Sequence, residues 1–393
     1  MKIEWSNRAH FFTKKELGYL NHFLEKSQNL TQGNELLKFE NGLKKYLKVK
    51  NVYALSSAAA ALEIIALLLN LKKGDEVIIP SHTYCVSAIP FARNKAKIVW
   101  ADIDIKTKTI NLLDVKKKIT KNTKAIVLVH LYGFSVDVNS FKKEIKNKNI
   151  KIIEDCAQAF GGNVNGKKTG TIGDFACFSF HAQKNMTTLG EGGAIYVKDN
   201  KMAKHVKGLR HNGHEKFNFY KKDYWKPAMT NVVENLNDYW PYKFTLSEIQ
   251  SAAGHLMLKR IDQLNKERIL RAKKFIYQIK KISNKLKFVE FFKHRRHVYH
   301  LLSAHVVPSK KFNRDKLIRL LYKKYNIKCA VQYYPLYKYD LFKKKKIGTK
   351  MINRNTEEFY NNMISFPFHI WMSGKEFNYL ISSCIKAIKE LDN

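Results

Sequence analysis

Short apolar runs alternate with helical patterns from about residue 51 to residue 197. Apolar and partly β-branched runs predict buried strands at residues 52–55, 76–80, 97–100, 125–129, 150–154, 175–179 and 194–197. Helical spacing of apolar residues predicts a helix over residues 59–71. This alternation predicts an α/β fold, with a mostly parallel sheet covered by helices on both faces. Ligands of such sheets bind beyond the carboxyl ends of the strands, so the polar residues after each strand are the candidates for chemistry.

The second half of the chain has a different pattern. Residues 211–243 are aromatic, polar and irregular, and they predict a long functional loop. Helical spacing returns over residues 246–282. Beyond it the pattern predicts strands at 298–307 and 329–333 and helices at 314–325 and 374–391. We therefore expect a large α/β domain with an N-terminal helical segment (1–250) and a small C-terminal domain (251–393). The lysine run at 343–346 predicts a solvated loop.

The composition is that of a folded, strongly basic protein. The 393 residues are 45% hydrophobic and 12% aromatic, which is enough for a core and excludes a disordered chain. Lysine and arginine number 72 against 33 acidic residues, a net charge of +39. Such an excess fits an anionic partner, namely nucleic acid, a membrane face or a phosphorylated small molecule. A lysine-rich host composition explains it equally well.

Cysteine usage and the N-terminus point to the cytoplasm. The five cysteines form no CxxC pair and no disulfide framework, which indicates a reducing compartment. The first residues lack the apolar region of a signal peptide. The longest apolar stretch, residues 58–69, is interrupted by Glu63 and is too short to span a bilayer. We expect a soluble cytoplasmic protein without membrane insertion. Histidines and cysteines are too scattered to suggest a metal site.

Two segments, residues 153–162 and 178–193, carry the candidate chemistry. Asp155 follows one predicted strand, Ser179 ends a later one, and Lys184 comes shortly after it. A buried acid, one amine and a hydroxyl suit pyridoxal 5′-phosphate, whose pyridinium nitrogen needs a carboxylate and whose aldehyde needs an amine. Ser57 precedes a predicted helix, and a helix N-terminus suits the phosphate. Tyr84 follows another strand and is placed to lie flat on the pyridine ring.

Each signal is weak alone, because an Asp after a strand is commonly a turn residue and a lone Lys is commonly exposed. Together the two segments resemble the DegT–StrS family of sugar aminotransferases. Further stretches that resemble this family are residues 56–62, 74–84, 247–253, 331–337 and 365–367. The resemblance covers almost the whole chain. It implies the fold-type I pyridoxal-phosphate transferase fold, with a mostly parallel seven-stranded sheet between helices. It also implies a homodimer whose partner subunit helps to close each site.

By this resemblance, Lys184 forms the Schiff base with the cofactor and Asp155 pairs with its pyridine nitrogen. Gln158 contacts the ring hydroxyl, Tyr84 stacks on the ring, and Ser179 binds the phosphate. The helix start adds Ser57, Ala58 and Ala59 to the predicted cofactor-binding residues. Candidate substrate contacts are His181, Glu191 and Tyr333.

The chain departs from the family pattern at two places. The phosphate loop has Ala58-Ala59 where the family usually has Gly-Thr, so a hydroxyl contact is lost. Lys243 stands where the family usually has an Asn that the partner subunit supplies. We predict that Lys243 reaches the phosphate across the dimer and offsets the missing hydroxyl, since a lysine is a good point charge for phosphate. The alternative is that Lys243 is one of many surface lysines.

The resemblance implies an enzyme, an aminotransferase that moves an amino group from L-glutamate to a keto-sugar. The acceptor would be a nucleotide-diphosphate-linked 3- or 4-keto (deoxy)hexose, in amino-sugar biosynthesis for a surface polysaccharide. One alternative is a sugar dehydratase, but family members of that kind carry His in place of Lys184. Another is a non-catalytic, basic nucleic-acid-binding or regulatory protein on this fold. The intact candidate site and the lack of helix-turn-helix, RNP or zinc-finger patterns favour the aminotransferase, with no specific nucleic-acid partner.

Overall fold

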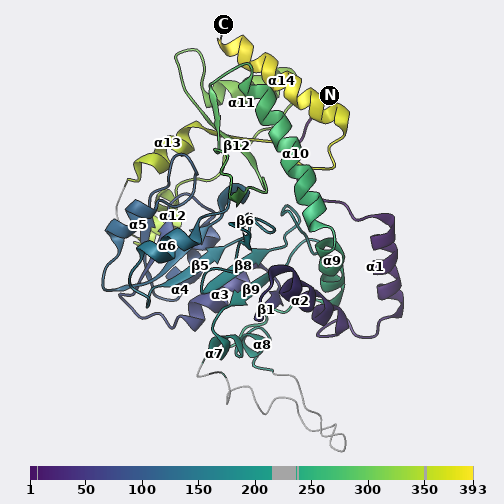
Figure 1. Cartoon of the computed structure of the whole chain (residues 1–393), viewed down its shortest axis with the longest axis vertical. Coiled ribbons are helices and arrows are strands. Elements are labelled where there is room, and N and C mark those ends of the chain that lie inside the picture. The colour runs from purple at the N-terminus through teal and green to yellow at the C-terminus, as the bar shows by residue number, and fades with distance from the viewer. Residues whose placement is uncertain (7, 215–235, 237–238, 349–351, 393) are drawn as a thin grey trace, which may run out of the picture.

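A seven-stranded sheet forms the centre of the molecule. The computed structural model describes all residues except 7, 215–235, 237–238, 349–351 and 393 (Figure 1). From one edge to the other the strands are β3 (Lys97–Ala101), β2 (Glu76–Pro80), β4 (Thr123–Val129), β5 (Lys151–Asp155), β8 (Phe175–Ser179), β9 (Gly193–Val197) and β1 (Val52–Leu55). All neighbours from β3 to β8 pair in parallel, and β9 is antiparallel to both β8 and β1. The predicted mostly parallel, seven-stranded α/β sheet is confirmed.

Helices cover both faces of this sheet, which explains why its strands are apolar throughout. In β2, Val77 and Ile79 face one hydrophobic cluster and Ile78 faces another. The first cluster includes α3 (Ala58–Leu68) and α4 (Ile89–Arg93), and the second includes α5 (Leu112–Lys118) and α6 (Val138–Glu144). A third cluster joins β1, β8 and β9 to α2 (Asn34–Leu47) and α9 (Glu248–Leu258). Alternate side chains of one strand thus enter different clusters.

A second, smaller core lies around the sheet β10 (Leu286–Phe288), β12 (Leu302–Val306) and β13 (Met363–Phe366). It is covered by α10 (Ile261–Lys280), α11 (Arg314–Tyr325) and α14 (Gly374–Asp392), which Figure 1 shows at the end of the molecule that carries the C-terminus. Ile3 joins this core and pairs with Ile327. The C-terminal part also sends Leu336 and Phe359 into the core of the central sheet. A domain boundary at residue 250 stays a prediction.

The other elements are short or peripheral. They are α1 (Lys14–Lys26), η1 (Cys85–Ser87), η2 (Leu131–Gly133), β6 (Asn163–Val164), β7 (Lys167–Lys168), α7 (Asn200–Ala203), α8 (Val206–Leu209), β11 (Arg295–Arg296), η3 (Leu336–Lys338), α12 (Asp340–Lys344) and α13 (Arg354–Asn362). A small sheet joins β7, β6 and β11.

Two predicted strands are shorter than expected or missing. Of residues 298–307 only β12 is a strand, because the preceding residues turn to the large sheet, where the Val298 N–H donates to the Gly133 carbonyl at 2.9 Å. Residues 329–333 form only an isolated bridge between Ala330 and Ser365. The chain then crosses to the central sheet, where the Leu336 N–H donates to the Ser81 carbonyl at 2.9 Å. Both corrections concern segments that approach the candidate site. Most of the predicted loop 211–243 lies outside the described residues.

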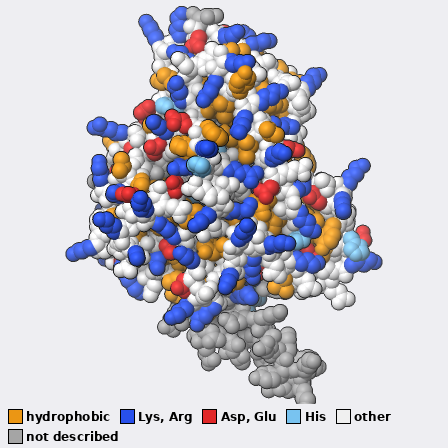
Figure 2. All heavy atoms as spheres, viewed as in Figure 1, with side chains coloured by type: hydrophobic (Ala, Val, Ile, Leu, Met, Phe, Trp, Pro, Cys, Tyr) orange, Lys and Arg blue, Asp and Glu red, His pale blue; other side chains and the backbone are white. Residues whose placement is uncertain are grey.

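Most basic side chains of the described residues lie on the surface of the molecule. Lysines 343–346 are exposed as predicted, although the first two belong to α12 instead of a loop. Figure 2 shows basic side chains spread over the whole visible face, without one dominant patch. In the described part of the chain, no helix combines the length and apolar character needed to cross a bilayer.

Candidate active site

The candidate acid, Asp155, is the last residue of β5 and lies at the carboxyl edge of the sheet. Its side chain is 6% exposed. One carboxylate oxygen, Oδ2, accepts a hydrogen bond from the Ser87 hydroxyl at 2.7 Å. The other, Oδ1, accepts one from the Ala157 N–H at 3.1 Å. The carboxylate is therefore fixed in orientation and largely removed from water.

The candidate amine, Lys184, follows β8 in a loop whose backbone is tied by a bond from the Lys184 N–H to the His181 carbonyl at 2.9 Å. Its side chain lines a cleft together with Tyr333 and His300. Burial lowers the pKa of the amine, while the negative charge of Asp155 acts in the opposite direction. Within the described residues the amine has no hydrogen-bond or ion-pair partner. An amine without a hydrogen-bond partner, close to a buried carboxylate and with a lowered pKa, is suited to nucleophilic and proton-transfer chemistry.

A set of polar and aromatic side chains surrounds Asp155. Gln158 accepts a hydrogen bond from the Tyr132 N–H at 2.7 Å and donates one to the Tyr333 hydroxyl at 2.8 Å. Tyr333 also lines the cleft with Lys184. Tyr84 is 54% exposed, and its ring centroid lies 5.9 Å from that of Tyr333. The exposed ring of Tyr84 is available to stack on a planar ligand.

An anion-binding feature stands at the start of α3. Ser57 is the N-cap residue, and its side-chain oxygen accepts from the Ala60 N–H at 3.0 Å. The backbone N–H groups of Ala58 and Ala59 then begin the helix, where donors have no acceptor within the helix. Gly193 permits this approach of helix and sheet, because a Cβ there would lie 2.4 Å from the carbonyl carbon of Ser57. Ser179 pairs with Gly193 across β8 and β9, so its side chain is at the same edge.

Three further candidate residues, His181, Glu191 and Lys243, lie on loops near the start of α3 or beside Lys184. His181 Nε2 is 3.6 Å from a carboxylate oxygen of Glu191, and both are on the loop that carries Lys184. Lys243 Nζ lies 2.8 Å from Nδ1 of His211. The backbone carbonyl of the next residue, Phe244, accepts a hydrogen bond from the Ser56 N–H at 2.9 Å. Lys243 therefore lies near the loop before α3 of its own subunit. A contact between Lys243 and the phosphate, across a dimer or within one subunit, stays a prediction.

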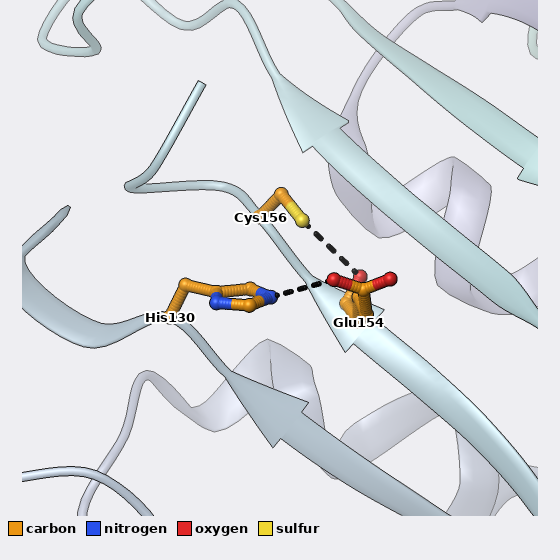
Figure 3. A group of neighbouring side chains, drawn as sticks. All are labelled: His130, Glu154 and Cys156. Carbon is orange, nitrogen blue, oxygen red and sulfur yellow. Dashed lines mark hydrogen bonds and ion pairs between the residues drawn. The ribbon is translucent and has the colours of Figure 1, made fainter. Parts of the chain in front are cut away.

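A buried cluster of His130, Glu154 and Cys156 lies directly beside Asp155, with its ligand-type atoms within 4.8 Å of one another (Figure 3). Its hydrogen bonds show what it does. Nδ1 of His130 accepts from the Val136 N–H at 2.9 Å, so Nε2 carries the proton and donates to Glu154 at 3.0 Å. The cysteine thiol points to the Glu154 backbone carbonyl at 3.9 Å, and burial raises its pKa well above the usual value. The atoms that a metal would need are thus already engaged or protonated.

The Glu154 carboxylate acts as a clamp on the turn before β8. It accepts hydrogen bonds from the backbone N–H groups of Gly170, Ile172 and Gly173 at 2.6–2.8 Å. Burial alone would raise its pKa, but the bonds from His130 and these backbone groups outweigh burial and lower it. Gly170 is required in this turn, since its φ is +83° and a Cβ would meet the Phe178 ring at 2.3 Å. This clamp fixes the end of β5 and with it Asp155.

Some residues of the site gave no clear signal in the sequence. Ser87 lies three residues after Tyr84 in η1, a spacing that could have suggested its contact with Asp155. His82 Nε2 lies 2.7 Å from the Tyr132 hydroxyl, which donates to the Gln332 carbonyl. Burial lowers the pKa of His82 to about 3, so it is neutral at physiological pH. Only folding brings these residues together, because they lie on segments far apart in the chain.

The arrangement fits the chemical needs of pyridoxal phosphate. The carboxylate of Asp155 is available for a pyridinium nitrogen, and the unpaired amine of Lys184 for an aldehyde. Ser179 and the start of α3 supply donors for a phosphate. These groups come from the ends of β5 and β8, the loop after β8 and the start of α3, at the carboxyl edge where α/β sheets bind ligands.

Comparison with known proteins gives consistent matches over the whole length. The sequence pattern of the DegT/DnrJ/EryC1/StrS aminotransferase family matches residues 12–384. The chain is 33% identical to GDP-perosamine synthase of Escherichia coli over 291 residues, 73% of each chain. It is 31% identical to dTDP-3-amino-3,6-dideoxy-alpha-D-galactopyranose transaminase of Aneurinibacillus thermoaerophilus, over 89% of each. The PLP form of the putative sugar aminotransferase Spr1654 from Streptococcus pneumoniae is 26% identical, with a TM-score of 0.86 and full coverage of both chains.

Proposed function

The chain belongs to the DegT/DnrJ/EryC1/StrS aminotransferase family, and on this premise we propose that it is a pyridoxal-phosphate-dependent sugar aminotransferase. It moves an amino group from L-glutamate to a keto-sugar carried on a nucleoside diphosphate. The observation that carries the proposal is the unpaired amine of Lys184, whose pKa burial lowers, close to the buried carboxylate of Asp155. The names of the relatives, which act on GDP- and dTDP-linked sugars, support the substrate class.

When bound, pyridoxal phosphate supplies an aldehyde that condenses with amines and a protonated ring that accepts electrons from a carbon centre. Asp155 would hold the proton on the ring nitrogen, and Ser87 keeps that carboxylate in place. Gln158 would contact the ring hydroxyl and Tyr84 one ring face. Ser179 and the N–H groups at the start of α3 would hold the phosphate.

Lys184 performs the proton transfers. Burial lowers the pKa of the amine, which makes it easier for the amine to lose its proton and act as a base. Its Nζ would take the proton from the α-carbon of the donor amino acid and, in the second half-reaction, would deliver a proton to the sugar carbon that receives the amino group. A His at this position would lack the amine for covalent attachment, so Lys184 favours transamination over dehydration.

The same proposal includes a homodimer in the cytoplasm. Apolar side chains that are exposed in the single subunit support an interface, among them Leu17 and Leu24 on α1 and Trp240, which is 86% exposed. We further propose that Lys243 of this loop region contributes to phosphate binding. The five cysteines are free thiols, which agrees with a reducing compartment.

The test is the visible absorption of the protein with pyridoxal phosphate, before and after L-glutamate is added. We expect a cofactor band that glutamate converts, and that does not form in Lys184→Ala. Lys198→Ala, which removes an exposed lysine, is the matched control and should behave as wild type. Amination of GDP- or dTDP-linked keto-sugars is then followed by mass spectrometry. A band that ignores glutamate would contradict the aminotransferase, and so would the absence of any band at excess cofactor.

A further inference from the structure

The cleft that holds Lys184 also contains a group of basic side chains that the proposed function does not use. Its walls include Arg8 of the N-terminal arm, Arg268 of α10, and His300 and His369. Neither Ser57 nor Ser179 lines this cleft. A ligand group bound here is therefore separate from the phosphate-binding residues at the start of α3.

Arg268 is a buried charge without a counter-ion. Its side chain is 2% exposed, and its Nη1 makes only two long bonds, to the Tyr299 carbonyl at 3.3 Å and the Phe368 carbonyl at 3.5 Å. Its Nε has no partner, and no carboxylate of the described residues pairs with the guanidinium. Burial lowers its pKa to about 10, so the group is charged at neutral pH. Buried guanidinium groups are usually paired, because isolated buried charge is unfavourable.

The neighbouring histidines do not supply the missing anion, and they offer further nitrogen atoms to a ligand. Nδ1 of His300 and Nδ1 of His369 are buried and lack partners among the described residues. Burial lowers the pKa of His369 to about 4 and that of His300 well below its usual value, so both are neutral. The positive charge in this part of the cleft thus comes from Arg268, Arg8 and Lys184.

The N-terminal arm holds Arg8 at the mouth of the same cleft. The Ala9 N–H donates to the Ala182 carbonyl at 2.9 Å, two residues from Lys184. The Trp371 indole donates to the Arg8 carbonyl at 3.0 Å. Arg8 itself lies over the Phe11 ring at 4.3 Å and donates from Nε to the His10 carbonyl at 2.7 Å. Among the described residues its terminal nitrogens have no hydrogen-bond partner and so can bind a ligand, and the contacts with Ala182 and Trp371 hold the arm in place.

We propose that Arg268 binds one carboxylate of the amino donor and that Arg8 binds the other, so that this cleft selects a dicarboxylic amino acid. The inference rests on the proposed aminotransferase function and deepens it. A planar guanidinium matches a carboxylate with two parallel hydrogen bonds. The donor carboxylate at Arg268 would bring the α-carbon near the amine of Lys184, since both line one cleft.

The experiment measures binding of two unreactive ligands, glutarate and butyrate, to the full-length protein by calorimetry. Arg268→Met should weaken both ligands at least about tenfold, since one charge-assisted pair is lost. Arg8→Gln should weaken glutarate by a similar factor and leave butyrate unchanged. Arg271→Met is the matched control from the same helix. Arg271 donates to the Met372 carbonyl and does not line the cleft, so neither affinity should change.

Thermal unfolding separates this role from a structural one. If Arg268 serves to bind a ligand, its unpaired charge does not stabilise the ligand-free protein. Arg268→Met should then unfold at the same or a higher temperature than the ligand-free wild type. A strongly lowered temperature would overturn the proposal, and so would wild-type glutarate affinity in Arg268→Met. Wild-type glutarate affinity in Arg8→Gln would overturn the dicarboxylate selection; this substitution is on the exposed arm and leaves the core unchanged.

The outcome for the proposed function is read separately. If glutarate binding depends on Arg268 but no keto-sugar is aminated, the sugar aminotransferase fails and the carboxylate site stands. If keto-sugars are aminated at the expense of glutamate and Arg268→Met keeps the wild-type KM for glutamate, the enzyme function stands and the carboxylate site fails.

Discussion

The clamp formed by Glu154 is the part of the site whose energetic role can be worked out most directly. Its two carboxylate oxygens accept four hydrogen bonds, from His130, Gly170, Ile172 and Gly173, with no exposure to solvent. In Glu154→Gln one oxygen becomes an NH₂ group, so two of the four donors lose their acceptor. Hydrogen bonds to charged groups contribute about 1.5–3 kcal/mol each, so the loss of two lowers the free energy of unfolding by about 3–6 kcal/mol.

The assay is urea unfolding at a series of pH values. The pKa of Glu154 is lowered in the folded state, so its contribution is fully present above the unfolded pKa near 4.5 and is lost as pH falls through the folded value. The difference between wild type and Glu154→Gln should therefore be constant at neutral pH and shrink in acid. Cofactor affinity should fall in parallel, because the clamp holds the end of β5 that carries Asp155.

Glu144→Gln is the control for this experiment, since Glu144 is exposed and pairs only with Lys116 at 2.6 Å. Its unfolding should match that of wild type, because exposed ion pairs contribute little. A loss below about 1 kcal/mol in Glu154→Gln at pH 7 would refute the clamp, since even one bond to a charged group should exceed it. A difference between the proteins that persists unchanged in acid would refute the assignment of the effect to the ionised carboxylate.

Three further predictions concern the cofactor. Asp155→Asn should retain cofactor binding but lower kcat on the order of 100-fold, because the charge that stabilises the protonated ring is gone; stopped-flow absorption measures this. Lys243→Ala should weaken cofactor affinity in a titration, whereas Lys117→Ala, which removes another exposed lysine, should not; equal affinities would remove the phosphate role of Lys243. Gly193→Ala should be destabilised by about 1–3 kcal/mol in urea unfolding and bind the cofactor less tightly, because its Cβ would meet the Ser57 backbone at 2.4 Å.

The sheet and the central residues were predictable because the signal for them is local. Residues 125–129 of β4 are all apolar and mostly β-branched, and Asp155, Ser179 and Lys184 lie at or near strand ends in the chain. The paths of residues 298–301 and 331–336 were not predictable from pattern. Their apolar residues resemble strands, but they pack on the central sheet through single bonds such as that from Leu336 to Ser81. Arg268 could not be predicted as a buried residue from the sequence, since a basic residue on a helix is ordinarily exposed.

The location of unpaired buried charge gives a stronger functional signal than the net charge of the chain. Several other buried charges in the described structure are satisfied within the protein: Arg210 pairs with Glu40, and Glu248 accepts hydrogen bonds from the N–H groups at the start of α2. Such pairing is the general rule for buried charge. Lys184 and Arg268 line the same cleft, and neither forms an ion pair with a carboxylate of the described residues. Because a fold tolerates uncompensated charge mainly where a ligand completes it, we infer the place of chemistry from this cleft and not from the surface lysines that produce most of the +39 charge.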